Sequence, residues 1–189
     1  MKNIITKTGS VFKIVCGNAS RLLRIALLRF SGVRISWSAN VCWDAEIKKM
    51  GGSIEIGDGT SIDKGVILRA YGGFISIGKN CSVNPYCVLY GHGGLQIQDY
   101  VRIATHSVFI PANHIYHNRD VKIYLQGEKM HGIKVEEDVW IATGVRVLDN
   151  VTIGKGSVVA AGAVVTKSLA PYGVYAGIPA KKISERGSE

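Results

Sequence analysis

The sequence predicts an all-β solenoid, and three observations predict it. Aliphatic residues recur every six positions through most of the 189-residue chain, a column of small side chains follows four residues behind them, and residues 110–132 interrupt this register once. A period of six fits neither a helix, whose side chains repeat every 3.6 residues, nor a hairpin strand, whose side chains alternate. It suits a parallel coil with three flat sides, in which three hexapeptides complete one turn.

Residues 1–34 precede the repeat and are expected to form a basic N-terminal helical segment. Residues 1–43 hold seven Lys or Arg side chains and no acid. A helix is predicted over residues 18–30, with Gly32 as its stop. One face of this helix is apolar and holds Leu22, Leu23, Ala26, Leu27 and Phe30. The other face is basic and holds Arg21, Arg24 and Arg29. Two roles stay open: a cap on the exposed edge of the first coil, or adsorption to a membrane surface.

The repeat occupies residues 35–169 and implies about six coils. Seventeen of its eighteen inward positions are Ile, Leu or Val. These positions are Ile35, Val41, Ile47, Ile56, Ile62, Leu68, Ile77, Val83, Leu89, Ile97, Ile103, Phe109, Val135, Ile141, Val147, Ile153, Val159 and Val165. The small column is Ala39, Ala45, Thr60, Val66, Cys81, Cys87, Val101, Ser107, Val139, Val145, Ser157 and Ala163. The two cysteines in it are therefore expected to fill corners of the core rather than to bind metal.

Residues 110–132 are expected to form an extended loop inserted between two coils. Three of the five histidines lie in it. An insertion of this length in a strict repeat more often has a function than merely connects two coils. Residues 170–189 follow the last repeat and are expected to form a C-terminal tail.

The composition argues against several classes of protein. The chain has 23 basic and 14 acidic side chains, and the excess lies near the N-terminus. No DNA-reading motif and no interleaved aromatic residues accompany the basic stretch, so no nucleic-acid partner is expected. No apolar run approaches the roughly 20 residues that cross a bilayer. The protein is therefore expected to be cytoplasmic, and the basic helix leaves open a contact with the inner face of the membrane.

The C-terminal half carries an ordered set of motifs. They are Val139-Trp140-Ile141-Ala142-Thr143-Gly144, Val151-Thr152-Ile153-Gly154-Lys155-Gly156, Ala161-Gly162-Ala163-Val164-Val165-Thr166-Lys167 and Ala176-Gly177-Ile178-Pro179-Ala180-Lys181. With these motifs the chain resembles the hexapeptide-repeat acyltransferases, closest to galactoside and maltose O-acetyltransferases and to exopolysaccharide and O-antigen O-acetyltransferases. The resemblance covers roughly residues 50–185.

This resemblance implies a fold, a co-substrate and an assembly. The fold would be a left-handed parallel β-helix of about six coils; the hand comes from the resemblance alone, since parallel crossovers are otherwise right-handed. Acetyl-CoA would be the co-substrate, with no metal required. The protein would be a homotrimer with active sites between its subunits, acting on a saccharide acceptor.

The resemblance also assigns site residues. The family's catalytic histidine lies at the start of the inserted loop, where Asn113-His114 stands in this chain. A hydroxyl acceptor needs a base within hydrogen-bond reach, and a histidine titrates close enough to neutral pH to serve. His114 is therefore expected to be the general base for direct attack on the thioester. The implied acceptor contacts are Asn84, His92 and His117. The implied acetyl-CoA contacts are Trp140, Thr143, Ala161, Thr166, Lys167 and Lys181.

Several alternatives remain open at the level of sequence. Amine and hydroxyl acceptors need the same base, so the chain could be an N-acetyltransferase acting on an aminosugar nucleotide. An antibiotic acetyltransferase would use the same chemistry. Zinc-dependent β-helix carbonic anhydrases share the scaffold, but His114 and His117 do not match their ligand spacing. A non-catalytic solenoid that uses its basic helix as a dock is the alternative from a different class.

Overall fold

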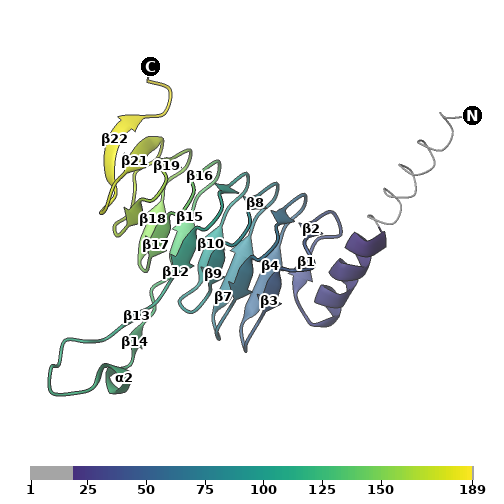
Figure 1. Cartoon of the computed structure of the whole chain (residues 1–189), viewed down its shortest axis with the longest axis horizontal. Helices are drawn as coiled ribbons and strands as arrows, with labels where there is room; N and C mark the ends of the chain where they lie inside the picture. The colour runs from purple at the N-terminus through teal and green to yellow at the C-terminus, as the bar shows by residue number, and fades with distance from the viewer. Residues whose placement is uncertain (1–18, 189) are drawn as a thin grey trace, which may run out of the picture.

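A computed structural model describes residues 19–188 of the chain. Short strands form three sheets around one core, and successive coils stack along a single axis (Figure 1). Residues 1–18, which include Lys2, Lys7, Lys13 and Cys16 of the expected basic segment, lie outside the described residues.

The three sheets are named A, B and C after the order in which the chain visits them. Sheet A holds β1 (Arg34–Ile35), β4 (Ser53–Ile56), β7 (Phe74–Ile77), β10 (Leu95–Ile97), β15 (Ile133–Val135) and β18 (Val151–Ile153). Sheet B holds β2 (Asn40–Val41), β5 (Ser61–Ile62), β8 (Ser82–Val83), β11 (Arg102–Ile103), β16 (Trp140–Ile141), β19 (Val158–Val159), β21 (Gly173–Ala176) and β22 (Lys181–Glu185). Sheet C holds β3 (Glu46–Lys48), β6 (Ile67–Arg69), β9 (Val88–Tyr90), β12 (Val108–Ile110), β17 (Arg146–Leu148) and β20 (Val164–Val165).

The six-residue column fills the interior of the coils. All eighteen of its residues are buried except Ile47, which is half-buried. Equivalent residues of successive coils pair in register, as Ile35 does with Ile56 and Ile56 with Ile77. Full burial of such a side chain contributes about 1.5–3 kcal/mol, so the stacked column is the main driving force for the fold. The predicted β-solenoid is confirmed.

The column of small side chains lines the corners of the core, as predicted. Its polar members donate to carbonyls of the following coil: the Cys87 thiol to Ala104 O at 3.1 Å and the Ser107 hydroxyl to Ala142 O at 3.1 Å. Burial raises the pKa of Cys87 to about 11 and also raises the pKa of the Cys81 thiol. Both thiols therefore stay protonated at neutral pH and act as small core residues.

The N-terminal helix, described over residues 19–30, closes the first coil with its basic face. Its guanidinium groups replace the hydrogen bonds that a further coil would have made. Arg21 donates to Trp37 O at 2.7 Å, and Arg24 donates to Ala45 O at 2.7 Å. Arg29 donates to the last carbonyl of β1. The helix therefore caps the exposed edge of the solenoid by hydrogen bonding.

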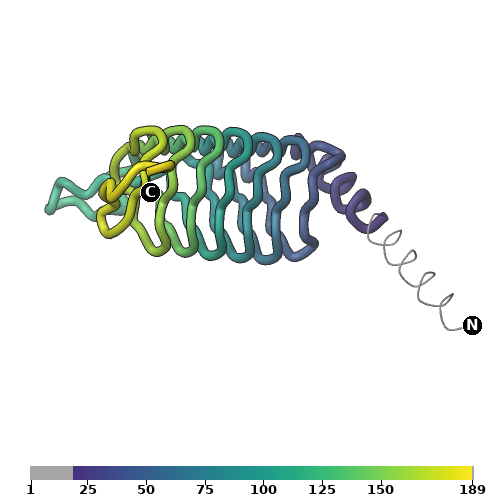
Figure 2. The backbone as a smooth tube through the Cα atoms, turned by 90° about the horizontal axis from the view of Figure 1, so that it is seen from above, coloured from purple at the N-terminus to yellow at the C-terminus, as the bar shows by residue number. Residues whose placement is uncertain are grey.

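The apolar face of this helix is turned to solvent. Ile25 and Leu28, which lie among the arginines on the basic side of the helical wheel, are the helix residues buried in the core. The outer face has the following exposed fractions: Leu22 42%, Leu23 55%, Leu27 49% and Phe30 94%. Figure 2 shows this helix at the N-terminal end of the stack. None of the described helices is long and apolar enough to cross a membrane.

The C-terminal residues extend sheet B instead of leaving the solenoid as a tail. Strand β21 pairs in parallel with β19, and β22 turns back to pair antiparallel with β21. Arg186, which follows β22, donates to Asp138 Oδ2 at 2.7 Å. The stack therefore ends on a strand whose direction is reversed.

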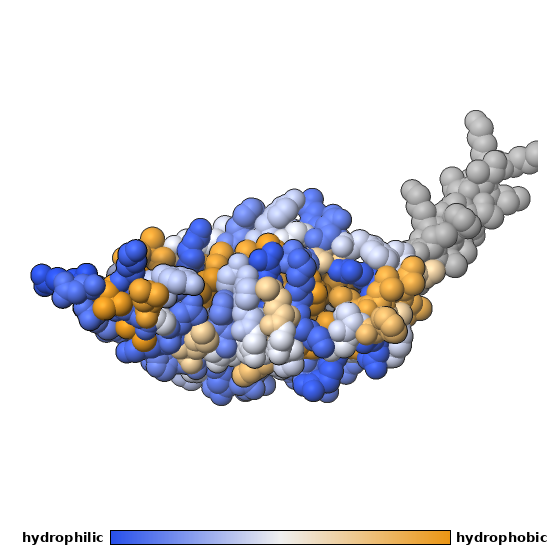
Figure 3. All heavy atoms as spheres, turned by 90° about the horizontal axis from the view of Figure 1, so that it is seen from below, coloured by the Kyte–Doolittle hydropathy of each residue, from blue (hydrophilic) through white to orange (hydrophobic). Residues whose placement is uncertain are grey.

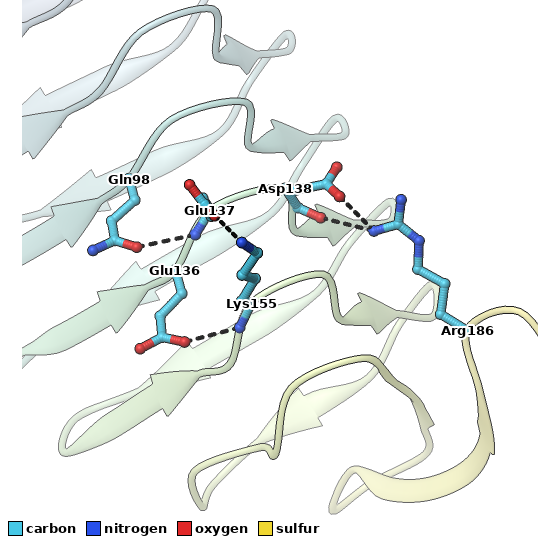
Figure 4. Close-up of polar contacts among 6 residues, drawn as sticks. All are labelled: Gln98, Glu136, Glu137, Asp138, Lys155 and Arg186. Atoms are coloured by element: carbon cyan, nitrogen blue, oxygen red, sulfur yellow. Dashed lines mark hydrogen bonds and ion pairs between the residues drawn. The ribbon is translucent and has the colours of Figure 1, made fainter.

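Polar side chains tie neighbouring coils together at the corner between sheets A and B. Figure 4 shows the six residues involved: Gln98, Glu136, Glu137, Asp138, Lys155 and Arg186. The amide of Glu137 donates to Gln98 Oε1 at 3.1 Å, and the amide of Lys155 donates to Glu136 Oε2 at 2.9 Å. Each contact satisfies a corner amide with a side chain from the preceding coil, where ladder bonds are interrupted.

Candidate active site

The inserted loop is a two-stranded arm that projects from the end of β12 (Figure 1). Strands β13 (Asn113–His114) and β14 (Glu128–Lys129) pair antiparallel, and the short helix α2 (Ile123–Gln126) lies near its tip. The side-chain Nε2 of Gln126 donates to Asn118 O at 2.8 Å and to Val121 O at 2.7 Å, and these bonds stabilise the turn of the arm. The expected loop is therefore an ordered element of the fold.

His114 lies on the arm opposite a carboxylate. The β13–β14 register places His114 beside Glu128, and His114 Nδ1 lies 3.5 Å from Glu128 Oε1. The histidine side chain is 64% exposed, so its other ring nitrogen is open to a substrate. At this distance the two side chains make an electrostatic contact and no hydrogen bond. No sequence pattern predicts this partner, because the pairing depends on the path of the arm.

A second histidine anchors the base of the arm. His131 Nδ1 lies 2.8 Å from Asp149 Oδ2, and the amides of His131 and Gly132 donate to Asp149 Oδ1 at 2.9 and 2.8 Å. Burial acts to raise the pKa of Asp149, but these hydrogen bonds together hold it below its ordinary value. A buried carboxylate with three donors fixes the point where the arm rejoins the coil. Neither His131 nor Asp149 was predicted from the sequence as a functional residue.

Gly93 lets the two ends of the arm meet. A Cβ at this position would lie 2.7 Å from Pro111 O, 2.7 Å from Gly132 N and 2.8 Å from the carbonyl carbon of Met130. All three atoms belong to the backbone, so a side chain at residue 93 would force the backbone of the arm to shift. The segment Tyr90-Gly91-His92-Gly93 thus supports the arm from the preceding coil.

The three expected acceptor contacts lie in different places. Asn84 is half-buried at the corner between sheets B and C. His92 stacks on Tyr71 with ring centroids 4.4 Å apart, and its buried Nδ1 has no hydrogen-bond partner among the described residues. His117 lies exposed on the arm beside Tyr116. Nothing in a single chain brings the three together with His114, so their role in binding stays a prediction.

The expected acetyl-CoA contacts form a strip along the corner between sheets B and C. Thr143 and Ala161 hold equivalent places in successive coils, because the amide of Gly162 donates to Thr143 O at 2.9 Å. Gly144 and Gly162 follow them with φ values of 69° and 71°, and a Cβ on Gly162 would have nothing within 4 Å. The strip is therefore flat and open, so an extended chain can lie close to the backbone.

The remaining expected donor contacts flank this strip. Trp140 begins β16 with a 53% exposed side chain. Thr166 and Lys167 are exposed after β20, and Lys181 is exposed at the start of β22. The amide of Ala180 donates to Val164 O at 2.8 Å, which places the start of β22 beside β20. Lys181 thus lies near the strip, whereas Lys167 follows the far end of β20; a lysine at this end of the coils suits the phosphates of a nucleotide.

Within residues 19–188, no three His, Cys, Asp or Glu side chains lie together in a way that could hold a metal ion.

Comparison with known proteins agrees with the fold and the repeat. Residues 132–167 match the model of the bacterial transferase hexapeptide (six repeats) family. A putative acetyltransferase of Schizosaccharomyces pombe is 51% identical over 57 residues, 30% of this chain and 28% of the relative. A chloramphenicol acetyltransferase of Klebsiella aerogenes is 37% identical over 59 residues, 31% of this chain and 28% of the relative. The chain therefore spans less than a third of the length of either relative.

Solved structures match over more of the chain. A mutant of AntD, an N-acyltransferase from Bacillus cereus in complex with dTDP-4-amino-4,6-dideoxyglucose and coenzyme A, has a TM-score of 0.76 at 25% identity, over 86% of this chain and 89% of that one. A maltose O-acetyltransferase from Clostridium difficile has a TM-score of 0.62 at 27% identity, over 70% and 69%. A Vibrio cholerae hexapeptide-repeat acetyltransferase complexed with acetyl-CoA has a TM-score of 0.64 at 28% identity, over 70% of each chain. The predicted left-handed β-helix of the acyltransferases is thereby confirmed as the fold.

Proposed function

We propose that this chain, which belongs to the hexapeptide-repeat transferase family, moves an acetyl group from acetyl-CoA to a hydroxyl group of a saccharide or sugar-linked intermediate. The observation that carries the proposal is the pairing of His114 with Glu128 on an exposed arm, at 3.5 Å. A base with an orienting carboxylate is the arrangement that activates a weak hydroxyl nucleophile.

The chemistry is a direct transfer. His114 accepts the proton of the acceptor hydroxyl while the oxygen attacks the thioester carbonyl carbon. The tetrahedral intermediate collapses, the carbon–sulfur bond breaks, and the protonated imidazole returns its proton to the leaving thiolate. Glu128 stabilises the imidazolium between these two proton transfers. The products are an acetyl ester and CoA, and no acyl-enzyme is formed.

The flat strip is the proposed binding site for acetyl-CoA. Pantetheine would lie along Thr143 and Ala161, where glycines keep the surface open. Lys181, which follows Ala180 beside Val164, would face the phosphates at the nucleotide end of the strip, and the exposed Lys167 would reach them from beyond β20. Two of the solved structures similar to this chain hold CoA or acetyl-CoA, which supports this assignment.

We place the complete active site between subunits of a homotrimer. In one chain the strip lies where the strands of sheet C begin, since Thr143 comes just before β17. The arm that carries His114 leaves from the opposite ends of these strands, after Ile110 of β12. An arm from one subunit that reaches the strip of its neighbour would bring base and donor together.

The test is acetyl-CoA turnover against a panel of saccharides, aminosugar nucleotides and chloramphenicol, followed by release of free thiol. His114→Ala should lower kcat by about 10²- to 10⁴-fold. Tyr124→Ala is the matched control, because Tyr124 is an aromatic residue on the same arm, is 89% exposed and has no assigned contact. A His114→Ala enzyme within about threefold of the wild type would rule out the general-base assignment.

The same panel separates hydroxyl from amine acceptors. The similar structure of AntD is that of an N-acyltransferase with an aminosugar nucleotide bound. Turnover with an aminosugar nucleotide but with no simple saccharide would replace O-acetylation by N-acetylation, with the same base and donor strip.

We also propose that the N-terminal helix docks the enzyme on an anionic membrane, on its cytoplasmic face. Its outer face exposes Leu23, Leu27 and Phe30 by 55%, 49% and 94%. Figure 3 shows apolar surface at this end of the molecule. No acid precedes Asp44; of the seven basic residues there, Arg21, Arg24 and Arg29 face the first coil, and Lys2, Lys7, Lys13 and Arg34 are left to attract anionic lipid. Apolar burial and attraction to anionic lipid both favour such a contact.

Flotation with vesicles of phosphatidylglycerol and phosphatidylcholine tests this docking. A double variant, Leu23→Ser with Phe30→Ser, should lose most of its vesicle binding. Ile123→Ser with Leu125→Ser is the matched control, because these arm residues are 53% and 66% exposed. Equal flotation of the two double variants would contradict a specific role of the helix.

A further inference from the structure

One position at the corner between sheets B and C adopts a positive φ in five coils. Its residues are Gly65 (66°), Tyr86 (62°), His106 (60°), Gly144 (69°) and Gly162 (71°). Glycine adopts this conformation freely, whereas a side chain with a Cβ is strained in it by about 1–2 kcal/mol. The two coils just before the inserted arm therefore keep large side chains where three others have none. Tyr100, at another corner, has the same strain with a φ of 61°, so strain alone marks no site.

The contacts of His106 distinguish it. Its Nδ1 lies 2.8 Å from the hydroxyl oxygen of Thr105, and that hydroxyl lies 2.6 Å from Pro85 O. Two oxygens this close require the hydroxyl proton between them, so Thr105 donates to Pro85 O and has no proton left for the imidazole. His106 Nδ1 must then be the donor to Thr105. In the neutral ring this leaves Nε2 unprotonated, with its lone pair free to accept a hydrogen bond.

His106 also stands at one end of the proposed donor strip. The Thr143 hydroxyl donates to Thr105 O at 3.0 Å, and the amide of Gly144 donates to the same oxygen at 2.9 Å. The residue before His106 is therefore the next step of the line formed by Ala161 and Thr143. Gly162 and Gly144 have no side chains at this corner position. Going from Ala161 towards the N-terminal coils, His106 is therefore the first residue there with a side chain. An extended ligand lying on the strip would meet its ring.

An aromatic surface continues beyond His106. The Tyr86 ring lies 5.4 Å from the His106 ring, centroid to centroid, at an interplanar angle of 31°. Tyr86 is 49% exposed, and Lys64 Nζ lies 5.9 Å from the centroid of its ring. Asn84 lies on the same turn, two residues before Tyr86. An exposed ring beside polar groups suits an amphipathic ligand that has an apolar face and hydroxyl groups.

We infer that His106 and Tyr86 form an acceptor subsite at the acyl end of the donor strip. His106 Nε2 accepts a hydrogen bond from one hydroxyl of a saccharide, and the exposed edge of the Tyr86 ring, which itself packs between His106 and Gly65, contacts the same sugar. His106 is thus a specificity-determining residue, and the inference rests on the proposed acetyl transfer. This role explains why His106 keeps a strained φ: glycine would relieve the strain but would also remove the nitrogen that accepts the hydrogen bond.

The test compares His106→Gly with Tyr100→Gly. Both changes relieve a strained corner and remove an aromatic ring, so both variants should fold, which circular dichroism melting checks. The acceptor is the saccharide with the highest turnover in the panel. His106→Gly should raise the KM for this acceptor about tenfold, as expected for one lost hydrogen bond of ordinary net strength. Its calorimetric Kd for CoA should stay within about twofold of the wild type, and Tyr100→Gly should match the wild type in both.

His106→Gln provides the rescue, because its amide oxygen can accept the same hydrogen bond. This variant should recover most of the lost affinity. An acceptor KM for His106→Gly within about twofold of that for Tyr100→Gly would overturn the inference while leaving the proposed function intact. If no saccharide is turned over, saturation-transfer NMR with the same panel detects the subsite directly. Equal signals from wild type and His106→Gly, or no saccharide signal, would then overturn it, whereas absence of CoA binding would overturn the proposed function.

Discussion

Glu128 is the residue that most changes the interpretation of the catalytic base. Without it, His114 would be a solitary side chain on an exposed arm. The Glu128 carboxylate lies 3.5 Å from Nδ1 of the imidazole, so in the proposed mechanism it faces the charge that the ring gains on accepting a proton. Glu128→Gln keeps the size of the side chain but removes the charge. We expect kcat to fall about tenfold with KM for acetyl-CoA little changed, because the carboxylate acts when charge develops on the imidazole.

Steady-state kinetics of Glu128→Gln measure this effect, and Glu137→Gln is the control. Glu137 is a carboxylate on the far corner of the coils, bonded to Lys155. A kcat for Glu128→Gln equal to that of Glu137→Gln would mean that His114 works without its partner.

Residue-level prediction from sequence succeeded for the core and was incomplete for the site. The buried thiols of Cys81 and Cys87 were predicted because a fixed period assigns every sixth position to the interior. Glu128 and the His131–Asp149 pair were not predicted. Their partners are set by the path of the arm, and no repeat constrains that path.

The arm is the element whose stability depends most directly on pH. Its base rests on Asp149, whose pKa is held below the ordinary value by His131 and two backbone amides despite burial. A carboxyl group with a lowered pKa in the folded state stabilises the protein above its ordinary pKa, about 4, and loses this contribution as pH falls through the folded value. We therefore expect the arm to loosen in acid below about pH 4.

Asp149→Asn tests this expectation by thermal melting between pH 3 and 7. At pH 7 the variant should be less stable than the wild type by about 1–3 kcal/mol, and the difference should shrink towards pH 3. Asp120→Asn, an exposed carboxyl on the same arm, should melt like the wild type throughout. A difference that is constant from pH 3 to 7 would show that the carboxylate charge is not what holds the arm.

The N-terminal helix was predicted from the sequence, but its orientation on the first coil was not. The helix itself followed from its periodicity, but the wheel does not show which face meets the coil. An apolar face normally packs inward. Here the first coil offers unpaired carbonyls at its edge, and arginines satisfy them better than leucines can. The leucines and Phe30 were therefore left outside.

At the scale of the whole molecule, the proposed trimer can be tested by mixing subunits. Ala161→Trp should block the donor strip, and His114→Ala should remove the base. Each variant alone should be nearly inactive. If base and strip come from different subunits, random mixed trimers made by joint refolding contain intact sites, and a 1:1 mixture should regain about a quarter of the wild-type activity.

The measurement is the acetyltransferase activity of the jointly refolded mixture. The control is the activity of the same two proteins refolded separately and then combined. No recovery in a mixture shown to contain mixed trimers would mean that base and strip act within one chain.

The two ends of the stack have a consequence for how the protein behaves at high concentration. A parallel solenoid presents the same hydrogen-bonding edge at each coil, so an open end could template another copy and grow into a fibre. Here the first edge is covered by arginine side chains, and the last strand, β22, runs in the opposite direction. Neither end offers the other a matching edge, so end-to-end polymerisation is blocked by the architecture itself.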